Sequence, residues 1–300
     1  MKKTLVSVSF AALILAAAPA GAAGEPDGEA PDEATEEEID SGRGLNFDLG
    51  FATAYVFRGV NVFSDGDQLD PHMLLAPGIR WSIFDTGLWL GYWGAFQLNG
   101  DNLSDNIDAG VGIEQDLLLG WDRDLGEAAT VSLFLYWYFY PAADKATAGA
   151  KVPSYMDPGM ALTVRPGVDL AVGISYFAAV QDALSDYRYL YLNPSIGKDF
   201  ELNERVGLEA KLGYGVKLYH RDSALRDNRH DVQLTVAVPI DIGSGWYLTP
   251  GLGAAWTDLA GEPPVVPQQQ VVPDPATVRG RPGSRNGYVV WGGLNVGVEL

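Results

Sequence analysis

Charged side chains recur in this sequence at alternate positions of segments that are otherwise apolar. Alternate residues of a β-strand point to the same face, and here the charged residues share their face with glycine and alanine. If that face borders an enclosed space, opposed acidic and basic groups create a transverse field that sorts solutes by charge. The residues that we expect to line such a space are Asp48, Arg58, Arg80, Glu114, Glu209, Lys211, Lys217 and Glu299.

The same charges allow a second interpretation of nearly equal weight. Opposed side chains can form a static ion-pair network that fills the space and ties the strands together. Strand direction places Arg58 and Lys217 nearer one mouth. It places the others toward the opposite end, with Asp48, Arg80 and Glu299 on neighbouring strands and Glu114, Glu209 and Lys211 across from them.

Aromatic residues are the second set of candidates on the inward face. Their rings could line a path for sugars or apolar compounds. A shift in strand phase would instead place them in the aromatic girdles at the membrane interfaces. We favour the girdle for Tyr138 and Tyr140 and leave the tryptophans open. The full set is Trp89, Trp93, Phe134, Tyr136, Tyr138, Tyr140 and Trp291.

Enzymatic chemistry has weak support. The three histidines are His72, His220 and His230, and the last two flank Ser223 and several acidic residues. A hydrolase needs a nucleophile, an oriented base and oxyanion donors, and no serine on a predicted strand lies beside a histidine. The acidic stretches 64–67 and 101–105 offer oxygen ligands for calcium, but neither has EF-hand spacing. We therefore expect no enzyme activity, no cofactor and no metal.

Composition excludes several classes of protein. The chain has 300 residues, with 20 basic against 39 acidic side chains, a net charge of -19. Such acidity argues against binding to nucleic acid, because that binding needs basic groups to neutralise phosphates. Cysteine is absent, which excludes disulfides and zinc–cysteine sites. After the N-terminus, no run reaches the ~20 apolar residues that a spanning helix requires.

The N-terminal segment has the organisation of an export signal. Lys2 and Lys3 precede an apolar run from Leu5 to Ala18, and small residues follow up to Ala23. This pattern predicts a signal peptide over 1–22. Residues 23–43 are rich in Asp and Glu and have no apolar periodicity, so we expect a disordered spacer. A binding tail for cations or a basic partner is the less favoured interpretation.

From residue 44 onward the hydropathy alternates with a period of two. Large apolar side chains occupy one face, as in Phe47, Leu49 and Phe51, and small or polar residues the other. This alternation predicts an all-β fold, a closed antiparallel transmembrane β-barrel over 44–300. About twelve strands are expected, near 44–58, 72–83, 87–97, 105–117, 129–140, 155–165, 169–177, 187–198, 206–218, 231–240, 246–256 and 288–300.

Connection lengths supply an independent argument. Outer-membrane barrels have short periplasmic turns and longer outer loops. Here the connections after even-numbered strands are short, except for 118–128, and those after odd-numbered strands are mostly longer. The contrast predicts both termini on the periplasmic side and a long Pro-rich outer loop over 258–287. A soluble β-sandwich is the rival fold, but glycine and alanine on the polar face fit a confined lumen better.

Two motifs resemble those of the TorF-type porin family of bacterial outer membranes. The segment Tyr55-Val56-Phe57-Arg58-Gly59 is similar to the start of that family's barrel, and Gly87-Leu88-Trp89-Leu90-Gly91-Tyr92-Trp93 resembles its third-strand pattern. The resemblance covers roughly residues 45–97 by motif. It implies an outer-membrane barrel with a channel role and leaves the substrate open.

The functional expectation is a porin-like channel in the bacterial outer membrane, through which small solutes diffuse passively along a narrow charged lumen. Its partners would be outer-membrane lipid and lipopolysaccharide, the solutes themselves, and the barrel-assembly machinery during biogenesis. The first alternative is a plugged structural barrel whose outer loops bind a partner or lipopolysaccharide. An outer-membrane hydrolase is the less favoured alternative.

Overall fold

A computed structural model describes residues 44–62, 73–99, 114–139, 154–179, 188–220, 228–258 and 287–300. The predicted signal peptide and acidic spacer lie outside these ranges. So do the acidic stretches 64–67 and 101–105, nearly all of the Pro-rich segment 258–287, and the side chains of His72, Tyr140 and Ser223.

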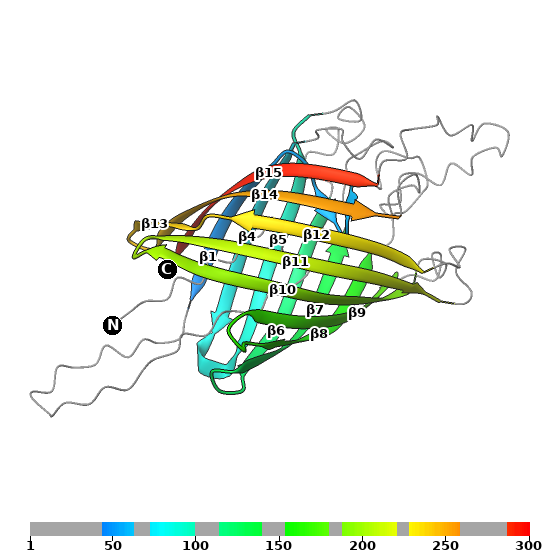
Figure 1. The fold of residues 1–300 in the computed structure, drawn as a ribbon, viewed down its shortest axis with the longest axis horizontal. Helices are drawn as coiled ribbons and strands as arrows, with labels where there is room; N and C mark the ends of the chain where they lie inside the picture. Colours follow the sequence, from blue (N-terminus) through cyan, green and yellow to red (C-terminus); the bar gives the residue numbers. More distant parts are fainter. Residues whose placement is uncertain are drawn as a thin grey trace, which may run out of the picture.

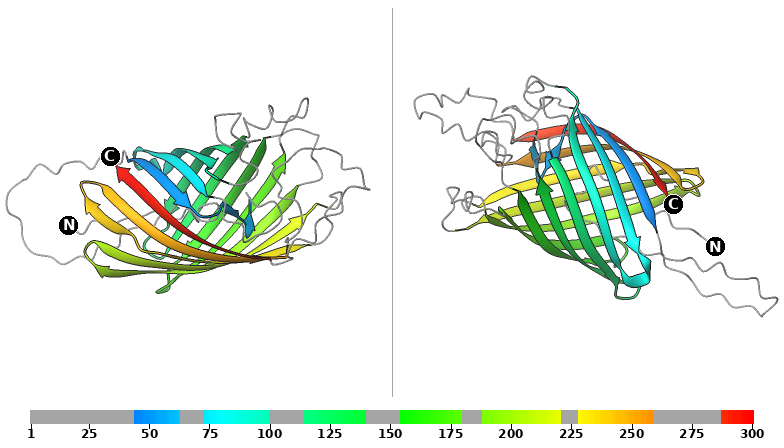
Figure 2. Two further views of the ribbon diagram at one scale, coloured as in Figure 1. Left: turned by 90° about the horizontal axis from the view of Figure 1, so that it is seen from above. Right: turned by 180° about the vertical axis from the view of Figure 1, so that it is seen from behind.

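The described residues form a closed antiparallel barrel (Figures 1 and 2). The ring closes because β1 pairs with both β4 and β15. Two strands, β12 and β13, follow one another between β11 and β14, so the ring has twelve strand positions. The wall strands are β1 (Leu45–Ala52), β4 (Leu74–Ile83), β5 (Leu88–Gln97), β6 (Glu114–Asp124), β7 (Ala129–Phe139), β8 (Tyr155–Val164), β9 (Asp169–Ala179), β10 (Tyr189–Asn203), β11 (Val206–Tyr219), β12 (Arg229–Ala237), β13 (Ile240–Gly243), β14 (Trp246–Thr257) and β15 (Tyr288–Glu299).

Burial along each strand follows the predicted alternation. In β1, Phe47, Leu49 and Phe51 are exposed on the outer face, whereas Asp48 and Ala52 are buried inside. The same pattern recurs around the ring, so the outer surface is a band of large apolar side chains. The closed all-β fold predicted from the alternation is confirmed. No helix among the described residues is long and apolar enough to cross a membrane.

One predicted strand is displaced. We expected the fourth strand at 105–117 and a long connection over 118–128. Residues 105–113 lie outside the described ranges, but β6 covers Glu114–Asp124, so the strand continues through most of the expected connection, and the connection to β7 has four residues. The three consecutive leucines 117–119 hid the alternation, since Leu118 faces inward and packs on the buried aromatic residues. This correction removes the exception among the connections, because every described turn at that end of the barrel is short. The first residue of β1 and the last residue of β15 lie at this same end of the barrel (Figure 1).

The first strand is shorter than predicted. We expected it to continue to Arg58 with Tyr55 and Phe57 facing lipid, but β1 ends at Ala52. Thr53 then forms two hydrogen bonds with Gly292 of β15. Its backbone nitrogen donates to Gly292 O at 2.9 Å, and its hydroxyl accepts from Gly292 N at 3.0 Å. Beyond it, β2 (Val56–Phe57) and β3 (Val60–Asn61) form a separate two-stranded hairpin.

We call residues 53–62 the inner hairpin, because they fold into the barrel (Figure 2). Its turn is tight: Arg58 and Gly59 both have positive φ, 48° and 81°. A two-residue hairpin turn of the I′ type needs positive φ at both central positions. Gly59 meets that requirement without strain, whereas Arg58 pays an energetic cost, which its contacts inside the barrel offset.

Candidate functional site

The inner hairpin crosses the lumen. In the ring, β9 lies six positions from β1 in either direction, so the two strands face each other. Near its base, Tyr55 donates a hydrogen bond to Glu114 Oε1 at 2.8 Å and packs on Trp93 with ring centroids 5.4 Å apart. At its tip, Arg58 reaches side chains of β8, β9 and β10. The hairpin therefore bridges opposite walls near the end of the barrel that has the long connections.

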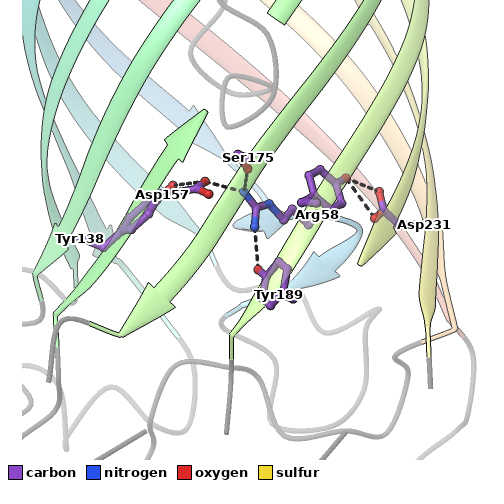
Figure 3. Close-up of polar contacts among 7 residues, drawn as sticks. Arg58, Tyr138, Asp157, Ser175, Tyr189 and Asp231 are labelled. Atoms are coloured by element: carbon purple, nitrogen blue, oxygen red, sulfur yellow. Dashed lines mark hydrogen bonds and ion pairs between the residues drawn. The ribbon is translucent and has the colours of Figure 1, made fainter. Parts of the chain in front are cut away.

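Arg58 inserts into a group of residues that we call the wall cage: Asp157, Ser175, Phe177, Tyr189 and Tyr191. The guanidinium donates to Asp157 Oδ2 at 2.5 Å, Ser175 Oγ at 3.0 Å and Tyr189 Oη at 2.7 Å (Figure 3). The carbon Cζ lies 4.3 Å from the Tyr191 ring centroid, a cation–π distance. Both ionic partners, Arg58 and Asp157, are 1% exposed.

A second carboxylate lies beside the wall cage. Asp231 on β12 accepts hydrogen bonds from Tyr191 Oη at 3.1 Å and from Gln233. A Cβ at Gly59 would lie 2.6 Å from the Asp231 Cβ, so the hairpin tip fits against this wall only with glycine. Lys217 on β11 donates to the backbone oxygen of Arg58 at 3.4 Å.

A second polar cluster lies toward the short-turn end. Arg80 on β4 donates to Asp122 Oδ2 on β6 at 3.0 Å, and its guanidinium carbon lies 4.3 Å from the Trp89 ring centroid. The Trp89 indole donates to the same carboxylate at 2.9 Å. Nearby, buried Asp48 accepts hydrogen bonds from Tyr247 and from Asn295, the latter at 3.0 Å. In the register of β1 and β4, Arg80 faces Asn46 and Asp48 faces Gly78, so Arg80 and Asp48 are diagonal neighbours on the inner face, as predicted from the sequence.

Two further predicted residues, Lys211 and Glu209, lie on β11. Lys211 faces Gly197 of the adjacent strand β10, which in turn faces Asp169 of β9, so Lys211 lies close to the carboxylates Asp169 and Asp199 of the two neighbouring strands. Glu209 is half-buried and faces Asp199 in the strand register. Glu299 is exposed at the rim, where β15 ends, and it faces Asn46 of β1, which in turn faces Arg80 of β4; it therefore lies on the strands next to Asp48 and Arg80, at the same end of the barrel.

Glu114 is the misplaced member of the predicted set. It is buried inside, as expected, but it begins β6 and so lies near the long connections, beside the inner hairpin. The sequence prediction placed Glu114 toward the opposite end, because Glu114 would lie near the end, and not the start, of a fourth strand at 105–117.

The structure also shows which face of the wall the described candidate aromatic residues occupy. Trp89, Trp93 and Trp291 are all buried inside the barrel, so the question left open for the tryptophans has an answer. The girdle assignment of Tyr138 is wrong: its side chain is 2% exposed and donates to Asp157 Oδ2 at 3.3 Å. Tyr140 lies outside the described residues.

Lumen glycines explain how so many rings fit inside. Trp89 lies directly opposite Gly120, and Trp291 directly opposite Gly253, in the register of neighbouring strands. A Cβ on either glycine would overlap the indole ring. The glycine-rich inward face thus provides the hollows in which aromatic side chains lie flat against the wall.

Gly120→Ala should therefore lower stability by about 1–3 kcal/mol, the usual cost of overpacking a close contact. The measurement is the urea midpoint of the protein in detergent micelles. Gly173→Ala is the matched control, because the nearest atom to its new methyl is 3.9 Å away. Equal midpoints for the two variants would contradict the packing role of Gly120.

Sequence reasoning missed most of the wall cage. Asp157 was overlooked because Pro158 made its strand look broken. Pro158 is exposed on the outer face, and it only interrupts the pairing of β8 with β9. The signal that could have found Asp157 is its two-residue spacing from Tyr155 and Gly159, the same inward face of β8.

Two of the three histidines, His220 and His230, lie within the described residues. His230 Nδ1 lies 2.6 Å from the hydroxyl of Tyr214, a side chain exposed on the outer face. Within the same residues, no three acidic or histidine side chains gather in a way that could hold a metal ion.

Comparison with solved structures finds several outer-membrane barrels. An outer-membrane channel from Pseudomonas putida F1 has 12% identity and a TM-score of 0.47, covering 90% of this chain and 100% of its own. The KdgM porin has 8% identity and a TM-score of 0.46, covering 85% and 97%. The NanC porin has 10% identity and a TM-score of 0.44, covering 85% and 98%.

Comparison with sequences gives one assignment. Among curated proteins, none matches the chain significantly. A family model described as a bacterial protein of unknown function, Gcw_chp, matches residues 36–272. That match spans most of the barrel, including the inner hairpin and the strands of the wall cage, and the chain therefore belongs to this bacterial family.

Proposed function

We propose that the protein is a porin-like channel of the bacterial outer membrane, through which small solutes diffuse passively along a narrow charged lumen. The observation that carries the proposal is the division of one closed wall into an apolar outer face and a charged inner face. The resemblance of the Tyr55–Gly59 motif to the TorF-type porins supports the same assignment.

The outer face supports the membrane location. Soluble monomers rarely expose large continuous apolar patches, yet exposed apolar side chains here lie on almost every wall strand. A closed ring leaves no strand edge unpaired, as hydrocarbon requires. Outer-membrane lipid, lipopolysaccharide and the assembly machinery would be its partners. The exposed positions include Leu49, Trp81, Leu90, Leu119, Leu133, Leu162, Val172, Leu212, Leu234, Leu252 and Val290.

The inner face supports the channel role. Arg80, Asp122 and Asp48 lie on one side of the lumen, and Lys211 with Asp169 and Asp199 on the other. Acidic and basic groups on both sides of a narrow passage create local fields that distinguish solutes by charge. The lining residues in this proposal are the eight predicted from the sequence, together with Asp122, Asp169 and Asp199.

A second candidate function, the plugged structural barrel, is favoured by a specific observation. The inner hairpin reaches from one wall to the opposite wall, and Arg58 is buried at its tip. A barrel that is blocked permanently at this level would hold its strands together and conduct nothing.

Single-channel recording distinguishes the two. The refolded mature protein in a planar bilayer should give discrete conductance steps. Arg80→Ala combined with Lys211→Ala should raise the cation-to-anion permeability ratio several-fold, because both changes remove positive charge from the lumen wall. Arg123→Ala, an exposed arginine next to Asp122, is the control and should leave the ratio unchanged.

Folding of each sample is verified by heat-modifiable gel mobility. A folded protein that never conducts would contradict the channel and favour the plugged barrel. Conductance whose selectivity is equal in the double variant and the Arg123 control would contradict the proposed lining.

A further inference from the structure

The wall cage and its occupant come from different parts of the fold. Asp157 belongs to β8, Ser175 to β9 and Tyr189 to β10, so the cage is built by the barrel wall alone. Arg58 enters from the inner hairpin, which is attached to β1 across the lumen. The arrangement resembles a binding site with its ligand, because the wall supplies the acceptor oxygens and a separate segment supplies the cation that they bind (Figure 3).

The chemistry of the wall cage selects an organic cation. It offers one carboxylate and two hydroxyl oxygens in hydrogen-bonding positions, and ring faces of Tyr191, Tyr189 and Phe177 at 4.3, 5.2 and 5.6 Å from the guanidinium carbon. Aromatic faces attract cations through the ring quadrupole. Asp231, behind Tyr191, adds a second negative charge that disfavours any anion at this point of the lumen.

Arg58 does not use all of what the wall cage offers. Among the described residues, Asp157 Oδ1 is buried without a hydrogen-bond partner, and so is Arg58 Nε. Buried polar groups are usually paired, so the fit between cage and occupant is incomplete. A free guanidinium or ammonium group, which is not constrained by a hairpin backbone, can turn to reach the vacant oxygen.

We propose that the wall cage is a binding site for the guanidinium or primary ammonium group of a small cationic solute, and that Arg58 occupies it as an internal counterpart of that group. The inference rests on the proposed function, since a solute reaches the cage through the channel. When the solute binds, Arg58 and the hairpin tip leave the wall, and the obstruction across the lumen is released.

The test uses methylguanidinium as the probe and titration calorimetry of the folded full-length barrel in micelles. Arg58→Ala vacates the wall cage and should bind the probe. Arg58→Lys keeps an internal cation in the wall cage and should bind the probe at least roughly tenfold more weakly than Arg58→Ala does. A factor of this size is the effect of a charge-assisted hydrogen bond in a site without water. Arg58→Ala combined with Asp157→Asn should lose the binding by a similar factor. Arg58→Gln is the second vacating variant if the alanine variant does not fold.

Binding by Arg58→Ala or Arg58→Gln that disappears with Asp157→Asn supports the proposal. Equal binding in the alanine and lysine variants, or binding that survives Asp157→Asn, would overturn it, as would no binding by either folded vacating variant. Bilayer recording keeps the two proposals apart. If no variant conducts but calorimetry shows Asp157-dependent binding, the channel function fails and the site remains. If the variants conduct but bind no probe, the site fails and the channel remains.

Discussion

Removing the inner hairpin should raise the conductance of the barrel several-fold. The change is replacement of residues 55–61 by a short glycine–serine linker. The hairpin lies across a ring of only twelve strands, whose lumen is already far narrower than that of the sixteen-stranded porins. Phe57 fills the space beside Arg58 and packs on Tyr138 and Phe177, with ring centroids 6.2 and 6.3 Å away. Removing the hairpin therefore clears the level at which it crosses the lumen.

The measurement is single-channel conductance beside the intact protein. Val60→Ala, on the same hairpin, is the control, since it trims a side chain but leaves Arg58 anchored, and its conductance should equal that of the wild type. If the intact protein is silent and the excised variant conducts, the plugged barrel is the native state and the hairpin is its plug. A folded excised variant with unchanged conductance would show that the hairpin does not restrict the passage.

The sequence predicted the wall well because the wall depends on a local signal. A strand between lipid and lumen must alternate in polarity, and that requirement is visible within a few residues, as in Phe47 to Phe51. Eleven of the twelve strand positions were found this way. The failure at β6 has a local cause as well, since Leu118 puts an apolar side chain on the lumen face and breaks the alternation.

The inner hairpin was not predictable by the same means. Tyr55 and Phe57 continue the alternation of β1 without a break, so the pattern is equally compatible with a longer strand. What turns them inward is a set of distant contacts, such as Arg58 with Asp157, 99 residues further along the chain. Pairings of this range leave no periodic trace. The positive φ of Arg58 is also hidden in the sequence, where Gly59 is the single local sign of a turn.

Loss of Asp157 should be the most destabilising single change in the lumen. Asp157→Ala leaves the Arg58 guanidinium buried at 1% exposure without its ionic partner. Removing one member of a buried ion pair typically costs ~3–5 kcal/mol. The Arg80–Asp122 pair supplies a matched comparison, since its side chains are 16% and 9% exposed, and Asp122→Ala should cost less because water reaches the remaining charge.

Double-mutant cycles on the two pairs make the comparison quantitative. Arg58→Met with Asp157→Leu should recover most of the stability lost in Asp157→Ala, because replacing both buried charges by apolar groups is often close to neutral. The unfolding is followed in urea, since guanidinium is itself a candidate occupant of the wall cage. Non-additivity at Arg58–Asp157 should exceed that at Arg80–Asp122. Equal coupling energies in the two pairs would mean that water enters the wall cage freely. The Arg58–Asp157 ion pair would then not hold the tip of the inner hairpin against the wall.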